Sequence, residues 1–139
     1  MTNYWAMKTF KDWADEFITR KEIGLDEEGV DADYLGYDKS NPPLDNTRIL
    51  RRFDQFCKWA SVGDYVLVGT GQTTKFNAKL VGVITGDYYF DALRQSYRHI
   101  RKIEVLKVYD EPVEIEKWGQ IQRIELVGHQ DFIETLIEC

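Results

Sequence analysis

Residues with which most enzymes perform chemistry are scarce in this chain. It contains two histidines, His99 and His129, and two isolated cysteines, Cys57 and Cys139, and neither pair has the spacing of metal ligands. No Gly-x-Ser-x-Gly motif is present, and Gly69-Thr70-Gly71 lacks the further glycines and the lysine of a phosphate-binding loop. We therefore expect no catalytic residue, no metal and no cofactor.

Long apolar runs and a targeting segment are missing as well. The uninterrupted apolar runs span only a few residues, far short of a membrane-spanning helix. The N-terminal segment MTNYWAMKTF lacks the basic start and the long apolar core of a signal peptide. An apolar share of 43% with 14% aromatic residues is that of a folded chain, and 139 residues fit one domain. The expectation is a single cytoplasmic domain over residues 1–139, without a disulfide framework or a membrane span.

The charge of the chain is segregated along the sequence. Its net charge is −6, yet residues 48–107 carry eleven Lys and Arg against five Asp and Glu. The first 47 residues carry five against eleven, and the last 32 carry two against eight. Because binding is set by the local field and not by the sum, the positive middle segment keeps a nucleic-acid partner open despite the acidic pI.

Apolar periodicity predicts a mixed α+β chain. Strands are expected at residues 3–8, 65–68, 80–85 and 102–109, with an apolar stretch at 121–127. Helical spacing covers residues 10–18 behind Thr9 as N-cap, residues 46–60 behind Asp45 or Asn46, and the C-terminal segment around Phe132. Residues 21–43 are rich in Gly and Asp and are expected to form a long irregular excursion. We expect a mixed β-barrel with helices packed outside.

Several segments together resemble a known family. They are Tyr4-Trp5, Ile23 to Asp31, Val62 to Leu67 and Val81 to Tyr89, whose order and spacing resemble an EVE domain. The run from Tyr97 to Ile103 is similar to the EVE-like N-terminal domains of McrB-type modification-dependent restriction motors. This resemblance implies a PUA-like barrel, related to the YTH readers, that holds a flipped modified base in an aromatic pocket and does not cleave. It favours DNA as the partner and a possible association with a restriction motor and nuclease.

The resemblance directs attention to a set of possible base-binding residues. We expect the stacking walls from Trp5 and from Tyr88 or Tyr89, which point opposite ways if extended, so at least one is available to a ligand. Leu25 stands where McrB-type relatives often carry Trp. Trp5 has an equally open reading as a core residue, and Trp59 lines the groove or covers the barrel end. The full expected pocket is Trp5, Leu25, Asp26, Asp31, Trp59, Tyr88 and Tyr89, where the two carboxylates could accept a hydrogen bond from an exocyclic amine.

Cations of the middle segment are the expected contacts to the nucleic-acid backbone, since several phosphate contacts together produce useful affinity. They are Arg48, Arg51, Arg52, Lys75, Arg98, His99 and Arg101. For His99, a structural role at the entry of a strand is favoured over direct contact. Arg98 and Arg101 also have a plain reading as solvated charges.

Two other classes of function stay open. A small metal-dependent nuclease could use Asp87 with Glu104 and Lys107, but a carboxylate and a lysine that share a site on a strand should be two residues apart. Glu104 and Lys107 are three apart. The second alternative is an RNA-binding or protein-interaction module that does not flip a base.

Overall fold

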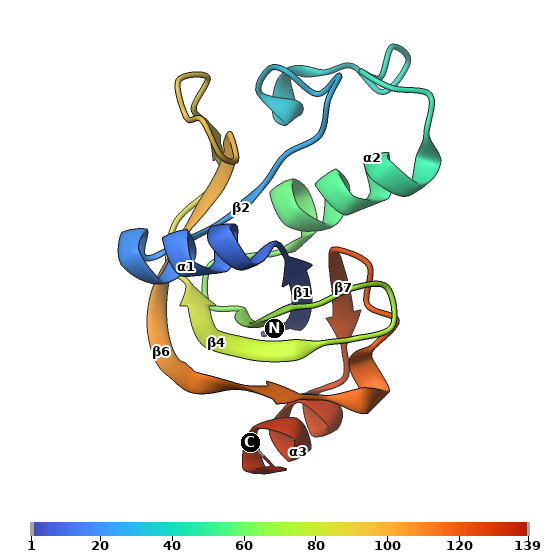
Figure 1. Ribbon diagram of the computed structural model, residues 1–139. Coiled ribbons are helices and arrows are strands. Elements are labelled where there is room, and N and C mark those ends of the chain that lie inside the picture. The colour runs from blue at the N-terminus through green and yellow to red at the C-terminus, as the bar shows by residue number, and fades with distance from the viewer. Residues whose placement is uncertain (1, 139) are drawn as a thin grey trace.

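A single curled sheet organises the chain. The computed structural model describes residues 2–138, and within them seven strands pair in the order β2-β6-β4-β3-β1-β7, with β5 beside β6. The strands are β1 (Tyr4–Thr9), β2 (Glu22–Leu25), β3 (Tyr65–Thr70), β4 (Asn77–Ile84), β5 (Tyr89–Phe90), β6 (His99–Glu114) and β7 (Ile124–Val127). The long β6 bends around one side, where its pairing with β4 shifts register twice, and the sheet curls into an open barrel (Figure 1).

Strand β1 lies inside the sheet, parallel to β3 and antiparallel to β7. Its residues Trp5 to Thr9 are all buried, because both faces of the sheet are covered at this point. Gly63 has a φ of 96°, a left-handed conformation that suits glycine, and it makes the turn into β3. The carboxylate of Asp64 beside it accepts hydrogen bonds from the backbone of Asn3 and Ser61 and thereby ties β1 to this turn.

Helices close the faces and the end of the barrel. They are α1 (Lys11–Arg20), α2 (Thr47–Phe53), its π-helical continuation η2 (Asp54–Trp59) and α3 (His129–Glu138), with short 3-10 turns η1 (Tyr34–Gly36) and η3 (Glu116–Trp118). Asn46 caps α2 as expected, since its side chain accepts from the backbone N–H groups of Arg48 and Ile49. The prediction that Thr9 caps the first helix is wrong. Helix α1 begins after Phe10, which makes no side-chain cap bond.

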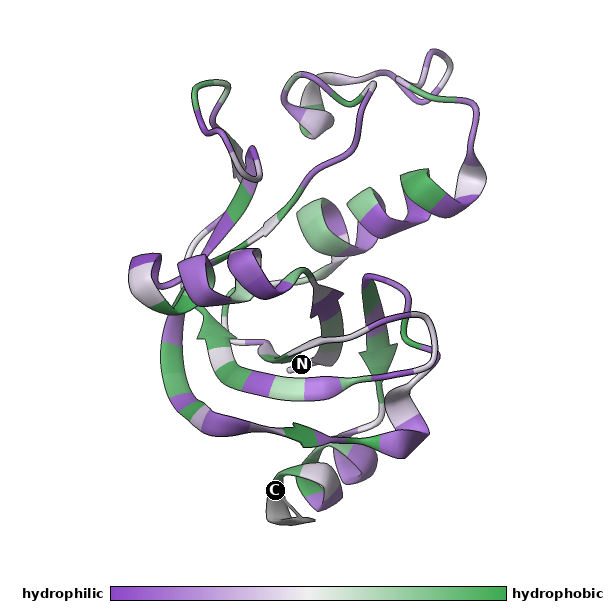
Figure 2. Ribbon diagram, viewed as in Figure 1, coloured by the Kyte–Doolittle hydropathy of each residue, from purple (hydrophilic) through white to green (hydrophobic). Residues whose placement is uncertain are grey.

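Two apolar clusters lie on opposite faces of the sheet. Trp5 and Met7 on β1 join the larger cluster, which α1, α2 and η2 cover, and Ala6 between them joins the smaller cluster, which Trp118 and Phe132 complete. This alternation is the two-residue period of a strand that is buried on both sides. Apolar residues, drawn in green, recur along the strands, whereas α1 is mostly polar and drawn in purple (Figure 2).

The expected mixed barrel with outer helices is confirmed, and one expected loop is corrected. Residues 21–43 are not wholly irregular, because β2 forms there and pairs with the start of β6. Gly24 allows this pairing: a Cβ atom at this position would lie 1.9 Å from the ring of Tyr97, which packs over the strand. Cys139 lies outside the described residues. Within residues 2–138, no helix is long and apolar enough to span a membrane.

Candidate nucleic-acid interface

The aromatic pocket expected from the sequence is filled by the protein's own side chains. Tyr88 is 8% exposed, stacks on the ring of His99 and places its hydroxyl 2.7 Å from Nδ1 of His99. The Tyr88 hydroxyl also accepts a hydrogen bond of 2.9 Å from the backbone N–H of Tyr34. Tyr34 in turn stacks on Phe53 of α2. Rings from three segments thus occupy the space in which a flipped base was expected.

Trp5 and Leu25 belong to the core and not to a pocket wall. Trp5 is 2% exposed, and its indole Nε1 donates to Asp64 over 3.0 Å. Leu25 is 4% exposed and lies on β2 opposite His99. The pocket expectation is therefore wrong for both residues. The physical reason is that Trp5 and Leu25 both point into the larger apolar cluster, which α1, α2 and η2 cover.

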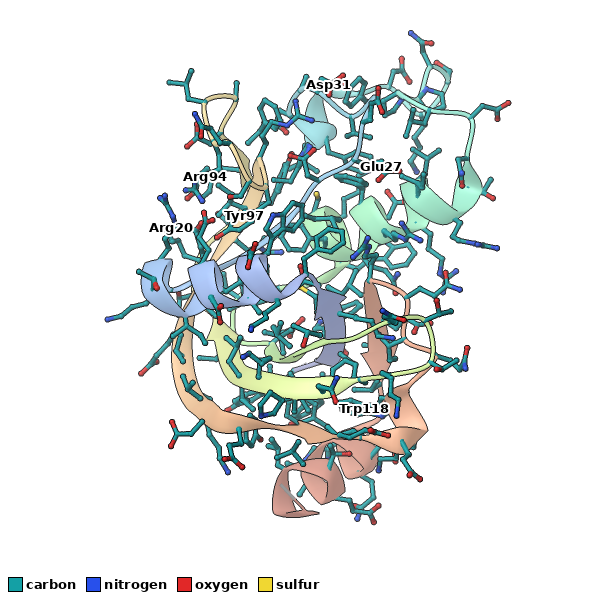
Figure 3. The ribbon with its side chains drawn as sticks, viewed as in Figure 1. Arg20, Glu27, Asp31, Arg94, Tyr97 and Trp118 are labelled. Carbon is teal, nitrogen blue, oxygen red and sulfur yellow. The ribbon has the colours of Figure 1, made fainter. Side chains whose placement is uncertain are left out.

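Arg98 forms ion pairs with Asp26 and Asp31, the two carboxylates that were expected to bind a base. Its guanidinium donates to Asp26 over 2.8 and 2.7 Å and to Asp31 over 2.8 Å, and its backbone N–H donates to Asp26 as well. These bonds raise the pKa of Arg98. Asp31 lies at the outer end of the loop that follows β2 (Figure 3). Arg98, Asp26 and Asp31 form a clamp between this loop and β6, so the three residues satisfy one another.

Other expected phosphate contacts have structural partners as well. Arg101 is 2% exposed and donates to the backbone carbonyls of Gly86, Phe56 and Ala60. His99 is fully buried, which confirms its structural reading. Lys75 is exposed but paired with Glu114 at 3.2 Å. Arg101 and His99 are therefore wrong as backbone contacts.

The fold neutralises much of the positive middle segment with acids from the two ends of the chain. Arg94 and Lys102 both bond the buried carboxylate of Glu22. Figure 3 shows Arg94 beside Tyr97 beneath the 91–98 loop, where the guanidinium lies 5.3 Å from the ring centroid. Lys79 pairs with Asp15 of α1. The charge segregation seen along the sequence is thus largely removed in three dimensions.

A cationic groove on α2 escapes this neutralisation. We call it the α2 groove, and its cations are Lys8, Arg48, Arg51, Arg52 and Arg123. A cavity of about 320 Å³ is lined by Lys8, Arg48, Arg52 and Arg123, together with Gln72, Thr73 and Gln122, and no carboxylate lines it. A smaller cavity of about 180 Å³ shares Arg48, Arg52 and Gln122 and adds Arg51, and one carboxylate, that of Glu125, lines it. Within residues 2–138, none of the five cations forms an ion pair.

Like charges lie close enough in the α2 groove to affect one another. Burial lowers the pKa of Arg123, and the neighbouring Arg52 lowers it further. Burial likewise lowers the pKa of Lys8, and Arg123 adds to that effect. The Nε of Arg52 is buried and has no hydrogen-bond partner within residues 2–138. An unpaired buried donor among repelling cations is a local arrangement that a bound anion would stabilise.

Topology assembles the groove from segments far apart in the sequence. The backbone N–H of Lys8 donates to the carbonyl of Arg123 over 2.7 Å, so the β1–β7 pairing brings these two cations together. Helix α2 lies beside β7 and adds its arginines (Figure 1). The sequence pointed to Arg48, Arg51 and Arg52 but missed Lys8 and Arg123. Both lie in acidic parts of the chain, and no spacing links them before the strands pair.

Two of the expected aromatic pocket residues remain accessible. Trp59 is 48% exposed at the end of η2, and the guanidinium of Arg51 lies 5.7 Å from its ring centroid. Tyr89 on β5 is half-buried against the larger core cluster. Only Trp59 of these two borders the α2 cations, so the structure brings it to the charged surface and leaves Tyr89 on the β5–β6 hairpin.

The residues of the nuclease alternative do not gather into a metal site. Glu104 lies on β6 opposite Val83, and Asp87 and Lys107 are exposed. In the described part of the chain, no group of three or more His, Cys, Asp or Glu side chains is arranged to hold a metal ion. The geometry gives this alternative no support.

Comparison with known proteins places the chain in a family. The model of a domain of unknown function (DUF8426) matches residues 14–126. The chain belongs to this family. No curated protein matches it in sequence.

Solved structures show a similar fold. The Mmi1 YTH domain has a TM-score of 0.58 and 14% identity over 99% of this chain and 96% of that chain. A hypothetical protein from Leishmania major has a TM-score of 0.63 and 12% identity over 99% and 94%. The YTH domain of Zygosaccharomyces rouxii MRB1, in complex with N6-methyladenosine RNA, has a TM-score of 0.57 and 12% identity over 99% and 83%. The expected PUA-like fold of the DUF8426 chain is confirmed as similar to that of YTH domains, and a relationship to McrB-type domains stays a prediction.

Proposed function

We propose that this DUF8426 protein binds nucleic acid through the α2 groove. The observation that carries the proposal is the cluster of arginines Arg48, Arg52 and Arg123 around one cavity. None of the three forms an ion pair within residues 2–138, the Nε of Arg52 is buried without a partner, and burial and the neighbouring Arg52 lower the pKa of Arg123. Lys8 lies beside them, and its ammonium donates to the carbonyls of Gln72 and Gly119. Arg48 and Arg51 extend the same surface along α2. Phosphates are the anions that such a row of cations matches, because guanidinium groups bind phosphate oxygens in fixed geometry and successive phosphates repeat along a strand.

Uncharged donors complete the phosphate site. Gln72, Thr73 and Gln122 line the same cavity as the cations. Side chains of these types commonly contact phosphate and sugar oxygens, which fixes the position of a strand without reading its sequence. The α2 groove therefore supplies affinity, and base recognition must come from another surface.

We further propose that the strand carries a modified base and that the protein reads this base without cleaving the strand. Support comes from the EVE-like motifs and from the YTH-related fold, one example of which was solved with N6-methyladenosine RNA. The McrB-type motifs favour DNA and an association with a restriction motor. The bound relative contains RNA, so both nucleic acids belong in the test.

A binding panel tests the proposal. Single-stranded and double-stranded RNA and DNA of one sequence are labelled with fluorescein and titrated at several salt concentrations by fluorescence anisotropy. Each is compared with versions that carry one methylated adenine, methylated cytosine or hydroxymethylated cytosine. We expect salt-dependent binding with a preference for one modified strand. Absence of salt-dependent binding to every member would reject the proposal, whereas binding without a preference would reject only base reading.

A further inference from the structure

A second concave surface lies between α2 and the loop that precedes it. The cavity measures about 320 Å³, and its lining residues are Tyr34, Tyr37, Asp38, Lys39, Pro42, Pro43, Leu50, Asp54 and Lys58. This volume lies within the range of small-molecule sites. The lining therefore combines two tyrosine rings, two proline rings and a leucine with four charged side chains, two acidic and two basic.

The aromatic wall is held rigidly. The hydroxyl of Tyr34 donates to Asp54 Oδ1 over 2.8 Å and lies 3.2 Å from the carbonyl of Leu50. The ring of Tyr37 lies 6.4 Å from that of Tyr34 at an angle of 58°, so the two rings form a corner. Tyr34 also separates this cavity from the filled Tyr88 cluster, because its backbone N–H bonds the Tyr88 hydroxyl. The cavity is thus distinct from the pocket expected from the sequence.

Asp54 and Lys58 are the charged groups of the cavity that lie against the ring of Tyr34. Asp54 uses Oδ1 for Tyr34 and for Lys58 at 3.5 Å, while its Oδ2 has no hydrogen-bond partner within residues 2–138. The ammonium of Lys58 lies 5.3 Å from the Tyr34 ring centroid. A carboxylate oxygen accepts from an exocyclic amine, as acidic side chains do from cytosine, and an ammonium donates to a ring nitrogen or carbonyl. Adenine, cytosine and guanine present this pair of groups, and uracil and thymine lack the amine.

The cavity is continuous with the α2 groove. A wide hollow that includes Trp59 shares Leu50 and Asp54 with the tyrosine cavity and shares Arg48 and Arg51 with the cationic cavities. The surface around α2 and η2 therefore carries the cations, Trp59 and the tyrosine cavity as neighbouring features. Flat side chains beside a cationic track are the arrangement with which proteins bind bases of a single strand.

We infer that the cavity between Tyr34, Tyr37 and the Pro42-Pro43 wall is a nucleobase site that takes an amine-bearing base of a single strand crossing α2. This inference rests on the proposed nucleic-acid binding at the α2 groove. The base lies against Tyr37 and the prolines, its exocyclic amine donates to Asp54, and Trp59 stacks a neighbouring base. A methyl group on the amine leaves one N–H for Asp54 and lies against the apolar wall.

Substitution of the tyrosine wall tests the site. Tyr37→Ala is compared with Tyr37→Phe, which keeps the ring, on fluorescein-labelled oligoadenylate, oligocytidylate and oligouridylate. Loss of a stacking face weakens binding by about tenfold. Tyr37→Ala should therefore bind oligoadenylate about tenfold more weakly than wild type, and Tyr37→Phe should bind it with unchanged affinity. Asp54→Asn removes the carboxylate and should reduce the preference for adenylate and cytidylate over uridylate. Leu93→Ala, which truncates a 91% exposed residue of the β5–β6 hairpin, is the control for removal of an exposed apolar side chain.

The outcomes separate this inference from the proposed function. If Tyr37→Ala and Asp54→Asn bind all three strands like wild type while salt-dependent binding persists, the nucleobase site is rejected and the α2 groove stands. If wild type binds none of the strands, the groove itself is rejected. Circular dichroism of each variant excludes unfolding as the cause of a loss of affinity. An equal loss of affinity in folded Tyr37→Ala and in the control Leu93→Ala would also contradict the site.

Discussion

The hydroxyl of Tyr88 lies 2.7 Å from Nδ1 of His99, and this contact fixes the protonation of the imidazole. Nε2 of the same ring lies 2.8 Å from the carbonyl of Val30, which can only accept, so Nε2 carries the proton. Nδ1 therefore accepts from Tyr88, whose oxygen accepts from the Tyr34 backbone. The chain of bonds joins β6, the segment before β5 and the loop after β2, and a neutral histidine completes it.

Stability should fall as the pH drops below the ordinary pKa of histidine. Burial lowers the pKa of His99 in the folded protein. The unfolded chain takes up the proton at about pH 6.5, where the folded protein still excludes it, so protonation favours unfolding between this pH and the lowered folded pKa. Urea unfolding from about pH 7.5 to about pH 5 measures the effect. The slope should diminish in His99→Gln and persist in His129→Gln, because His129 is exposed; equal slopes in all three proteins would contradict it.

Trp5 should behave as a core residue. It is 2% exposed and bonds Asp64, so Trp5→Ala should lower the free energy of unfolding by about 3–5 kcal/mol. Trp59→Ala is the matched control, since this ring is 48% exposed and its loss should cost well under 1 kcal/mol. Urea denaturation of both variants gives the comparison. If the stability of Trp5→Ala equals that of wild type, the core assignment of Trp5 is contradicted and a role in binding is favoured.

Enlarging Leu25 should destabilise the protein and leave binding unimproved. Leu25 is 4% exposed in the larger core cluster, and an indole there would overfill a close-packed site at about 1–3 kcal/mol. Melting temperature and oligonucleotide affinity are measured on Leu25→Trp and on Leu25→Met, which nearly conserves volume. Tighter binding by a stable Leu25→Trp protein would show that position 25 faces the ligand.

The sequence predicted the elements of the fold better than the site. Alternation and helical spacing located most strands and helices, and Asn46 capped α2 as its residue type predicts. The pocket could not be predicted in the same way, because an aromatic on a strand packs equally well in a core or against a base, and only coverage of the face decides. Trp5 shows this ambiguity, since the helices over β1 bury it.

Charge was informative only where the fold leaves it unpaired. The sequence grouped Arg98 and Arg101 with the α2 arginines, but Asp26 and Asp31 satisfy the first and three backbone carbonyls satisfy the second. The sequence could not predict that Lys8 and Arg123 join the α2 groove, because strand pairing, and not closeness in sequence, makes them neighbours. Long-range pairing is the part that local patterns do not contain.

The salt dependence of nucleic-acid binding in charge variants tests the central claim most directly. Arg48→Gln/Arg52→Gln removes two cations of the α2 groove, and Arg20→Gln/Lys117→Gln removes two exposed cations that are paired with Glu16 and Asp131. Both variants change the net charge equally, so only the position of the charge differs. For a single strand, each lost phosphate contact should reduce the log–log slope of affinity against salt by about 0.7. We predict a slope smaller by about 1.4 for the groove variant and an unchanged slope for the control; equal slopes in the two variants would contradict binding at α2.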